Sequence, residues 1–317
     1  MKKILLAALA LYSCLAFSNV RVGAYINDIQ ELELESHSYA MDLYIWFKWK
    51  DKSLNPAESF EFMNPSELWG HMVTNTYDKP EVLPDGTLYQ VVRIQGRFSE
   101  KFNLADYPFD KQRLVVSFED SANDISEGSK YVLDDGKVGM DSDVKLPGFE
   151  IKSPKIELVN QEYNTDFGDT RTIKDRTNYS KVVISVPIER PIFAYLIKLV
   201  LPIFCIVFCA CLMFLFHPKY IDARVGVGIT ALLTVVALQI TLNNDLPEVA
   251  YLILMDKIYI ATYMFIILGL AVVMMGSWKL EKGEHLRDKI IKVDRISLGV
   301  LLGIYSLSVG GMLVQSI

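Results

Sequence analysis

The fold is decided by one stretch, Asp222-Ala-Arg-Val-Gly-Val-Gly-Ile-Thr-Ala-Leu-Leu-Thr-Val-Val-Ala-Leu-Gln-Ile-Thr-Leu-Asn-Asn-Asp-Leu-Pro247. It is long and apolar enough to cross a bilayer as a helix, because about 20 apolar residues reach across the hydrocarbon core. Residues three or four positions apart share one face of a helix. Here that face, which we call the mixed stripe, combines small, hydroxyl and aliphatic groups with an acid and an amide at its ends: Asp222, Gly226, Thr230, Leu233, Ala237, Ile240, Thr241 and Asn244.

A wettable face on a membrane helix is typical of a helix that lines a water path. The alternative is a buried span whose threonine hydroxyls bond back to carbonyls of their own helix. The stretch by itself is compatible with both interpretations, so the rest of the chain has to decide between them.

The charge of the chain is unevenly distributed. The 317 residues are 51% hydrophobic and carry a net charge of −6. Residues 191–317 hold ten basic and eight acidic side chains and residues 1–18 hold two lysines, which leaves −10 for residues 19–190. An acidic segment argues against nucleic acid as a partner. Placed above a pore, the same charge would raise the local concentration of cations.

The N-terminus has the pattern of a secretory signal peptide over residues 1–18. Two lysines precede the apolar run Ile4–Leu11, and small residues follow near position 16. Such a leader exports the segment that follows it.

Residues 19–190 have the pattern of a β-sandwich. In 39–49 the apolar side chains of Tyr39, Met41, Leu43, Ile45 and Phe47 alternate with polar or amphipathic ones, which predicts a half-buried strand. Further strands are expected at 88–98, 113–118, 149–159 and 179–188. Turn compositions at 84–86, 134–136 and 147–148 separate them. Many short strands with this spacing favour a sandwich.

Residues 191–317 predict a four-helix transmembrane domain with spans at about 192–216, 225–244, 257–275 and 295–317. The segment 276–294 is rich in lysine and arginine, so the positive-inside rule makes it a short cytoplasmic loop. The sandwich and the C-terminus then lie outside the cytoplasm, in agreement with the leader. In a bacterium this is the inner membrane.

The sequence contains no constellation typical of an enzyme, a cofactor site or a metal site. Cys205, Cys209 and Cys211 fall within one apolar span, where small buried hydrophobic side chains are more typical than metal ligands.

Several motifs in order along the chain resemble those of the pentameric ligand-gated ion channels. They are Trp49 with Asp51 in the second strand, the loop Leu104-Ala-Asp-Tyr-Pro-Phe-Asp110, Arg190-Pro191 before the first span, Pro202 within it, Ala223-Arg-Val-Gly-Val-Gly-Ile-Thr230, and Leu246-Pro247 ahead of the third span. The stretch Ala223–Thr230 is similar to the anion-conducting glycine-receptor branch.

Departures from the family pattern resemble its prokaryotic branch. Glu100 and Leu114 stand about where the family's name-giving cysteines belong, and the loop between the third and fourth spans is short. The family's Trp-x-Pro segment is Trp69-Gly70-His71 here, without the proline.

The resemblance implies a homopentamer, surrounded by membrane lipids, whose mixed stripes face a central pore. Leu233 and Ile240 would form hydrophobic rings that gate by dewetting. Five Asp222 side chains would form an anionic ring that favours monovalent cations. Arg224 lies about 200° around the helix from Asp222 and should point away from the axis. The Ala223–Thr230 match favours anions instead; we predict cation selectivity on electrostatic grounds.

The resemblance also implies a gating cluster where the sandwich domain meets the spans. Arg190 should pair with Asp110 and with Glu33 or Glu35 of the first hairpin, close to Pro108 and Pro247. A buried cluster of this kind is costly to break, so it can transmit motion between domains. The alternative is an ordinary interfacial salt bridge.

The agonist site implied by the resemblance lies between subunits, with walls formed by Tyr163, Phe167 and Tyr179 of one subunit and Tyr44 or Trp46 of the next. Aromatic rings bind organic cations through their faces. Ser121 stands about where many relatives carry an aromatic residue, which argues against a cationic amine. Protons are the other stimulus, and His37 is the best placed histidine, although a solvated role is the simpler expectation.

The sequence therefore predicts a cation channel, opened by a small-molecule agonist or by protons, and no enzyme. The alternatives are an anion-selective channel of the same architecture and a non-conducting receptor anchored in the membrane. A secondary transporter is disfavoured because no internal repeat is visible.

Overall fold

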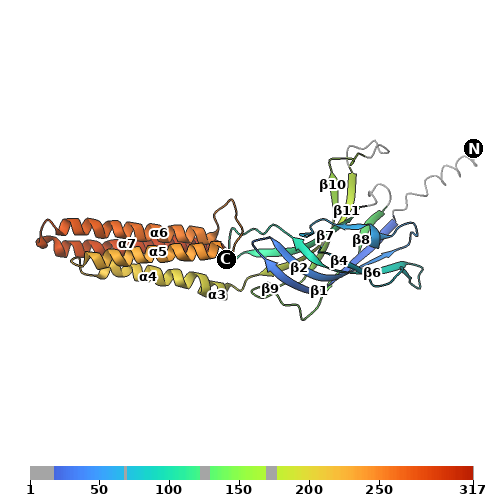
Figure 1. Cartoon of the computed structure of the whole chain (residues 1–317), viewed down its shortest axis with the longest axis horizontal. Helices are drawn as coiled ribbons and strands as arrows, with labels where there is room; N and C mark the ends of the chain where they lie inside the picture. The colour runs from blue at the N-terminus through green and yellow to red at the C-terminus, as the bar shows by residue number, and fades with distance from the viewer. Residues whose placement is uncertain (1–17, 68–69, 122–128, 169–176, 317) are drawn as a thin grey trace, which may run out of the picture. The chain divides into compact units, whose positions relative to one another are not determined.

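The computed structural model describes residues 18–316 except 68–69, 122–128 and 169–176. The expected signal peptide lies outside the described residues apart from Ser18. The chain divides into two units (Figure 1). The sandwich unit comprises Met1–Phe102 and Gln112–Ile188, and the helical unit comprises Asn103–Lys111 and Glu189–Ile317.

The sandwich unit consists of two sheets. The first has the strand order β4-β6-β2-β1-β8, with β5 also paired to β6. Its strands are β1 (Ser18–Glu33), β2 (Ser38–Trp49), β4 (Met72–Asn75), β5 (Glu81–Val82), β6 (Leu88–Ser99) and β8 (Ser129–Met140). The second sheet has the order β10-β11-β7-β3, with β9 paired to β11. Its strands are β3 (Phe60–Phe62), β7 (Lys111–Asp120), β9 (Glu150–Ile151), β10 (Lys155–Tyr163) and β11 (Thr177–Glu189); the short helix α2 (Pro56–Ser59) precedes β3.

The alternation predicted for β2 is confirmed. The five side chains predicted to point inward are at most 3% exposed, because successive residues of a strand point to opposite faces of the sheet. Phe47 of β2 packs edge-on against Phe118 of β7, with ring centroids 6.2 Å apart, and Phe118 packs in the same way against Tyr131 of β8 at 5.8 Å. The core therefore lies between the two sheets.

Two sequence expectations in this unit are wrong. The segment 134–136, expected as a turn, lies inside β8, where the register against β1 shifts and Asp135 has φ 54°. A turn-like composition here makes an irregularity within a strand. The strand expected at 149–159 is divided into β9 and β10, and Pro154, which has no N–H to donate, lies in the gap.

Among its described residues, the helical unit contains four helices that are long and apolar enough to cross a membrane, with mean hydropathy of 2.7, 2.1, 2.4 and 1.8, in chain order, over an apolar 18-residue window of each. The first is α3 (Ile192–Tyr195), the π-helical turn η2 (Leu196–Val200) and α4 (Leu201–Leu215) in succession. The others are α5 (Ile221–Asn243), α6 (Leu254–Leu280) and α7 (Arg287–Ser316), with the 3₁₀ turn η3 (Glu284–Leu286) before α7. Pro202 enters α4 directly after η2, where an altered bonding pattern accommodates its missing N–H.

Several helix ends differ from the expected spans. α5 begins at Ile221, and α6 and α7 run through much of the expected loop 276–294. Charged residues end an apolar run without ending the helix. A prediction from hydropathy alone therefore makes these helices too short. Cys205 and Cys209 are exposed within a single subunit, so the expectation that they are buried is wrong for the subunit alone.

α5 packs against α4 and α6 through one face. Its buried residues are Arg224, Gly228, Ala231, Val235 and Leu242. A Cβ added to Gly228 would lie 2.4 Å from Leu270 Cδ2, so this glycine lets α6 approach closely.

Candidate functional site

The mixed stripe lies on the face of α5 that the subunit leaves uncovered. All eight of its residues are exposed within a single subunit. At about 100° per residue, they centre on the side of the helix opposite Arg224, Ala231 and Val235, which are buried. The buried-span interpretation is therefore wrong for the subunit alone. One part of it holds, because the Thr241 hydroxyl donates to the carbonyl of Ala237 at 3.0 Å.

The two charged residues in the first turn of α5 have opposite surroundings. Asp222 is exposed, whereas Arg224 is 0% exposed. Arg224 Nε donates to the carbonyl of Met213 on α4, and Nη2 donates to Asp294 Oδ2 on α7, both at 2.6 Å. The guanidinium is therefore turned into the bundle and neutralised there.

Sequence reasoning missed Asp294. The signal was present, because Asp294 stands beside the apolar run that begins at Ile296, and a charge at membrane depth needs a partner. Which base pairs with it depends on the packing of α7 against α5, and no sequence spacing reveals that.

Arg190 and Asp110 meet as the resemblance implied. Arg190 Nε lies 3.0 Å from Asp110 Oδ1, and the two side chains are 3% and 2% exposed. Nη1 donates to the Tyr195 hydroxyl at 3.0 Å. The guanidinium carbon lies 4.9 Å from the ring centroid of Tyr107 and 5.0 Å from that of Tyr195. Two aromatic faces, the Tyr195 hydroxyl and the Asp110 carboxylate thus contact the cation.

The loop 103–111 is hydrogen-bonded to the segment between α5 and α6. Leu104 N–H donates to the Tyr251 hydroxyl, and Leu254 N–H donates to the carbonyl of Ala105, both at 2.9 Å. A cavity of about 530 Å³ in the helical unit is lined by Leu104, Asn244 and Pro247, among others. Pro108, which follows a cis peptide bond, belongs to the same loop. Asp110 and Pro247 therefore lie in one connected part of this unit.

Glu33 is engaged within the sandwich unit. Arg97 Nη2 lies 3.3 Å from Glu33 Oε1, and the same guanidinium pairs with Glu31. The Glu33 side chain is 57% exposed. The expected pairing of Arg190 with Glu33 or Glu35 stays a prediction.

The three aromatic residues expected on one side of the agonist site gather into a cluster. Tyr163 packs edge-on against Phe167 at 5.5 Å and against Tyr179 at 5.9 Å between ring centroids. Phe167 is 63% exposed. We call these three residues the aromatic cluster. The segment 169–176, which connects its members, lies outside the described residues.

Glu119 of β7 stands beneath the aromatic cluster and was missed by sequence reasoning. The Tyr163 hydroxyl donates to Glu119 Oε1 at 2.9 Å. The carboxylate is 6% exposed, and its Oε2 is buried with no hydrogen-bond partner among the described residues. Burial raises the pKa of Glu119, while the hydrogen bond from Tyr163 and the charge of Lys181 oppose the rise. Burial and the bond to Glu119 raise the pKa of Tyr163 to about 12.

Tyr44 and Trp46 lie on the polar face of the first sheet. Trp46 covers Gly23, where a Cβ would lie 2.1 Å from the indole, and its Nε1 donates to Asp134 at 2.9 Å. Tyr44 lies under Arg93, whose guanidinium carbon is 5.5 Å from the ring centroid. Tyr163 and Tyr179 of the aromatic cluster lie instead on β10 and β11 of the second sheet, and Phe167 follows β10.

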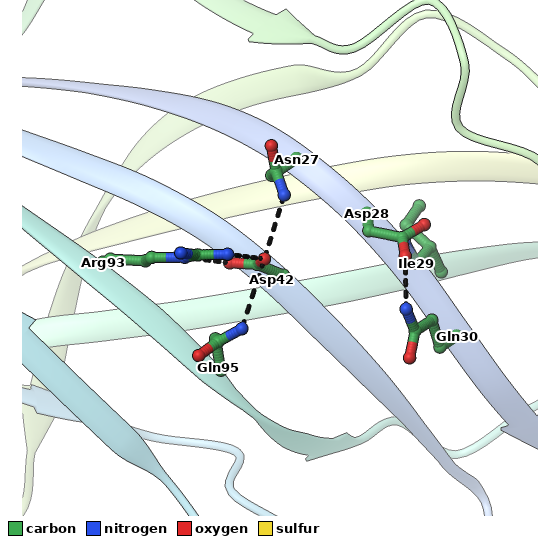
Figure 2. Close-up of polar contacts among 7 residues, drawn as sticks. All are labelled: Asn27, Asp28, Ile29, Gln30, Asp42, Arg93 and Gln95. Atoms are coloured by element: carbon green, nitrogen blue, oxygen red, sulfur yellow. Dashed lines mark hydrogen bonds and ion pairs between the residues drawn. The ribbon is translucent and has the colours of Figure 1, made fainter.

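Asp42 ties the neighbouring strands of that face together (Figure 2). Arg93 binds its carboxylate with Nε at 3.1 Å and Nη2 at 2.7 Å, and Asn27 and Gln95 donate to it at 2.9 and 3.3 Å. The bond from Arg93 lowers the pKa of Asp42 most, against the effect of burial. This fixed network supports Tyr44 from the adjacent strand β6.

The structure also gives the surroundings of His37 and Ser121. His37 is not simply solvated, because its Nδ1 accepts a hydrogen bond from Phe102 N–H at 3.1 Å. Ser121 is exposed, and its hydroxyl donates to the carbonyl of Ser59 at 2.9 Å.

Known proteins are similar to this chain over most of its length. No family model matches it. The chain is 24% identical over 301 residues to the "Proton-gated ion channel" of Gloeobacter violaceus, covering 89% of this chain and 79% of that protein. It is 24% identical over 268 residues to "Glycine receptor subunit beta" of Homo sapiens, and of Rattus norvegicus, covering 78% of this chain. It spans about half of that receptor subunit, 52% of its length.

Proposed function

The chain belongs to the pentameric ligand-gated ion channels, and on that premise we propose that five copies form a cation-selective channel lined by α5. The family consists of channels and not of enzymes. The protein is a multi-pass membrane protein. We place it in the bacterial inner membrane, with the sandwich and the C-terminus outside the cytoplasm, because 276–294 is basic and residues 1–18 resemble a leader.

The single observation that supports cation selectivity is the contrast between Asp222 and Arg224. Asp222 is exposed at the start of the mixed stripe, whereas Arg224 is neutralised inside the subunit. Five copies around an axis would therefore present a ring of carboxylates without a matching ring of guanidinium groups. Like charges that line a narrow mouth concentrate the opposite ion.

Two apolar rings are the proposed gate. Leu233 is 64% and Ile240 57% exposed, on the same face. Seven residues of helix separate them by about 10 Å. Rings of large aliphatic side chains expel water from a narrow pore and stop ion flow without a physical plug. Thr230 and Thr241 keep the rest of the stripe wettable.

The proposed stimulus acts on the sandwich unit, and the aromatic cluster with Glu119 is its candidate site. Exposed ring faces and an incompletely bonded buried carboxylate suit a small cationic agonist, and we weigh this geometry above the argument from Ser121 against a cationic amine. The same carboxylate also suits protons, because burial raises its pKa. Tyr44 and Trp46 would come from the neighbouring subunit. The cluster around Arg190 and Asp110 would then pass the signal to the helices.

Reversal potentials test the proposal. The full chain is purified into planar bilayers and activated in a screen of pH and small amines, and NaCl is then diluted on one side. We expect the reversal potential to move toward the sodium equilibrium potential, and the shift to shrink in Asp222→Asn. A shift toward the chloride potential would favour the anion-selective alternative. Silence under every stimulus would favour the non-conducting receptor.

A further inference from the structure

The buried end of Arg224 depends on one acidic side chain that is far from the mixed stripe in sequence. Met213 supplies a backbone carbonyl, which carries no charge, and Asp294 supplies the carboxylate. Both distances are 2.6 Å, and the side chains of Arg224 and Asp294 are 0% and 2% exposed. Among the described residues, this carboxylate is the charge that balances the guanidinium.

The two hydrogen bonds also fix the direction of the guanidinium. One bond leaves from Nε toward α4 and the other leaves from Nη2 toward α7, so rotation about the side chain breaks at least one of them. Gly276 on α6 lets α7 pack closely near this pair, since a Cβ there would lie 3.2 Å from Ile290 Cγ2. Two helices, α4 and α7, therefore hold one side chain of α5.

We propose that Asp294 is a selectivity-determining residue of the channel, because it holds and neutralises Arg224 inside each subunit. This inference rests on the proposed function. Asp294 touches no ion in the pore and acts by positioning Arg224. The charge of the cytoplasmic mouth thus depends on two residues. Asp222 lies on the mixed stripe, and Asp294 lies on α7, the last helix of the chain.

The physical reason is the short distance between the two charges on α5. Residues 222 and 224 differ by about 3 Å along the helix axis, so any net charge on Arg224 acts at the level of the Asp222 ring. Without Asp294 the guanidinium has two options. It stays buried and adds an uncompensated positive charge to a medium of low dielectric, or it turns toward water. Five such charges would offset five carboxylates in either case.

The test uses Asp294→Asn in the full-length pentamer, with the reversal potential under NaCl dilution as readout. The substitution keeps the shape of the side chain and removes its charge. We expect the cation-to-anion permeability ratio to fall at least about tenfold. Asp288→Asn is the matched control, because it removes the same charge from the first turn of α7, where the side chain is 86% exposed. It should leave the ratio unchanged.

A double variant separates positioning from a direct effect of the carboxylate. Arg224→Met with Asp294→Leu removes both charges and replaces them with apolar groups, which a buried pair often tolerates. We expect it to restore the cation preference of the wild type. If Asp294→Asn alone does not assemble, variant and wild-type subunits are mixed, and the permeability ratio should fall stepwise with each variant copy.

The outcomes distinguish the two proposals. An anion-selective wild type would contradict the proposed function, whatever the variants do. A cation-selective wild type with an equally selective Asp294→Asn pentamer, or mixed pentamers of unchanged selectivity, would overturn the inference alone. A double variant that assembles but stays weakly selective would show that Asp294 does not act through Arg224.

Discussion

Two buried arginine–aspartate pairs stand at opposite ends of the first span, Ile192–Leu215, and they differ in what surrounds them. Arg190 and Asp110 lie before the span, where the rings of Tyr107 and Tyr195 flank the guanidinium and form what we call the aromatic cage. Arg224 and Asp294 lie after it, between helices. The ionic chemistry is the same at both ends, so the difference in surroundings determines what each pair does.

The partners of the first pair lie on a loop and a short helical turn, whereas the partners of the second lie on long helices. Arg190 donates hydrogen bonds to Asp110 and to the Tyr195 hydroxyl, and it lies against the ring faces of Tyr107 and Tyr195, so its partners are on the loop 103–111 and the turn of α3. Arg224 is held by the hydrogen bonds that it donates to Met213 of α4 and to Asp294 of α7. A loop-based pair suits the transmission of a signal, and a helix-based pair suits a fixed charge.

The largest expected effect is a loss of stability when one partner is removed from either pair. Asp294→Asn and Asp110→Asn each leave a guanidinium buried with less compensation, which costs about 3–5 kcal/mol. Thermal unfolding of the detergent-solubilised pentamer measures it. Asp288→Asn, an exposed change, serves as the control. If either buried substitution were as mild as the control, that pair would not be a buried ion pair in the assembled channel.

The comparison is sharpest when both partners are removed together. Arg224→Met with Asp294→Leu should recover most of the lost stability and keep stimulus-evoked current, because packing replaces the charges. Arg190→Met with Asp110→Leu should also recover stability but lose the response to the stimulus. Current per surface-expressed channel is the measurement. A normal response in the second double variant would remove Arg190 from signal transmission.

A smaller effect is expected at the edge of the aromatic cage. Tyr195→Phe removes the hydroxyl that accepts a hydrogen bond from Arg190 at 3.0 Å, and bonds to charged groups contribute about 1.5–3 kcal/mol. Tyr107→Phe keeps its ring face and is the control. We expect Tyr195→Phe to lower the unfolding temperature more than Tyr107→Phe does. Equal shifts would show that the ring faces, and not the hydroxyl, hold the cation.

Glu119 is a buried carboxylate whose hydrogen-bond partner is a tyrosine, Tyr163, and not an arginine. Burial raises its pKa in the folded protein above the unfolded value, so ionised Glu119 destabilises the fold. This penalty is present above the folded pKa and disappears as the pH falls toward the unfolded pKa. Glu119→Gln should therefore stabilise the protein at neutral pH, with a difference from the wild type that vanishes on acidification.

The same substitution at the exposed Glu157 of β10 is the control for this pH dependence and should give a flat difference. Free energies of unfolding at several pH values provide the measurement. A Glu119→Gln difference that grows on acidification would contradict the raised pKa.

The smallest effect belongs to the exposed acids of the first hairpin. Glu33 is 57% exposed where it meets Arg97, and exposed pairs contribute about 0–1 kcal/mol. Glu33→Gln should barely change the unfolding temperature. A loss of stimulus response in this variant, without a loss of stability, would support the predicted pairing with Arg190.

Patterns in the sequence predicted the features that depend on a single strand or helix. The period of two in β2 placed its buried face, and the period of 3.6 in α5 placed the exposed stripe. The pairing of Arg190 with Asp110 was anticipated from a resemblance. Asp294 and Glu119 were not anticipated, because their roles depend on which distant element packs against them. The composition of 134–136 suggested a turn, but pairing of β8 with β1 outweighed it.

The claim that the mixed stripe faces water can be tested with two alanines of α5. Ala237 lies on the stripe and is exposed, whereas Ala231 is 5% exposed on the packed face. In a background with Cys205, Cys209 and Cys211 replaced, Ala237→Cys and Ala231→Cys are treated with a charged, water-soluble thiol reagent during stimulation. We expect rapid block of current in Ala237→Cys and little change in Ala231→Cys. Equal reactivity, or block of Ala231→Cys alone, would contradict a pore lined by this stripe.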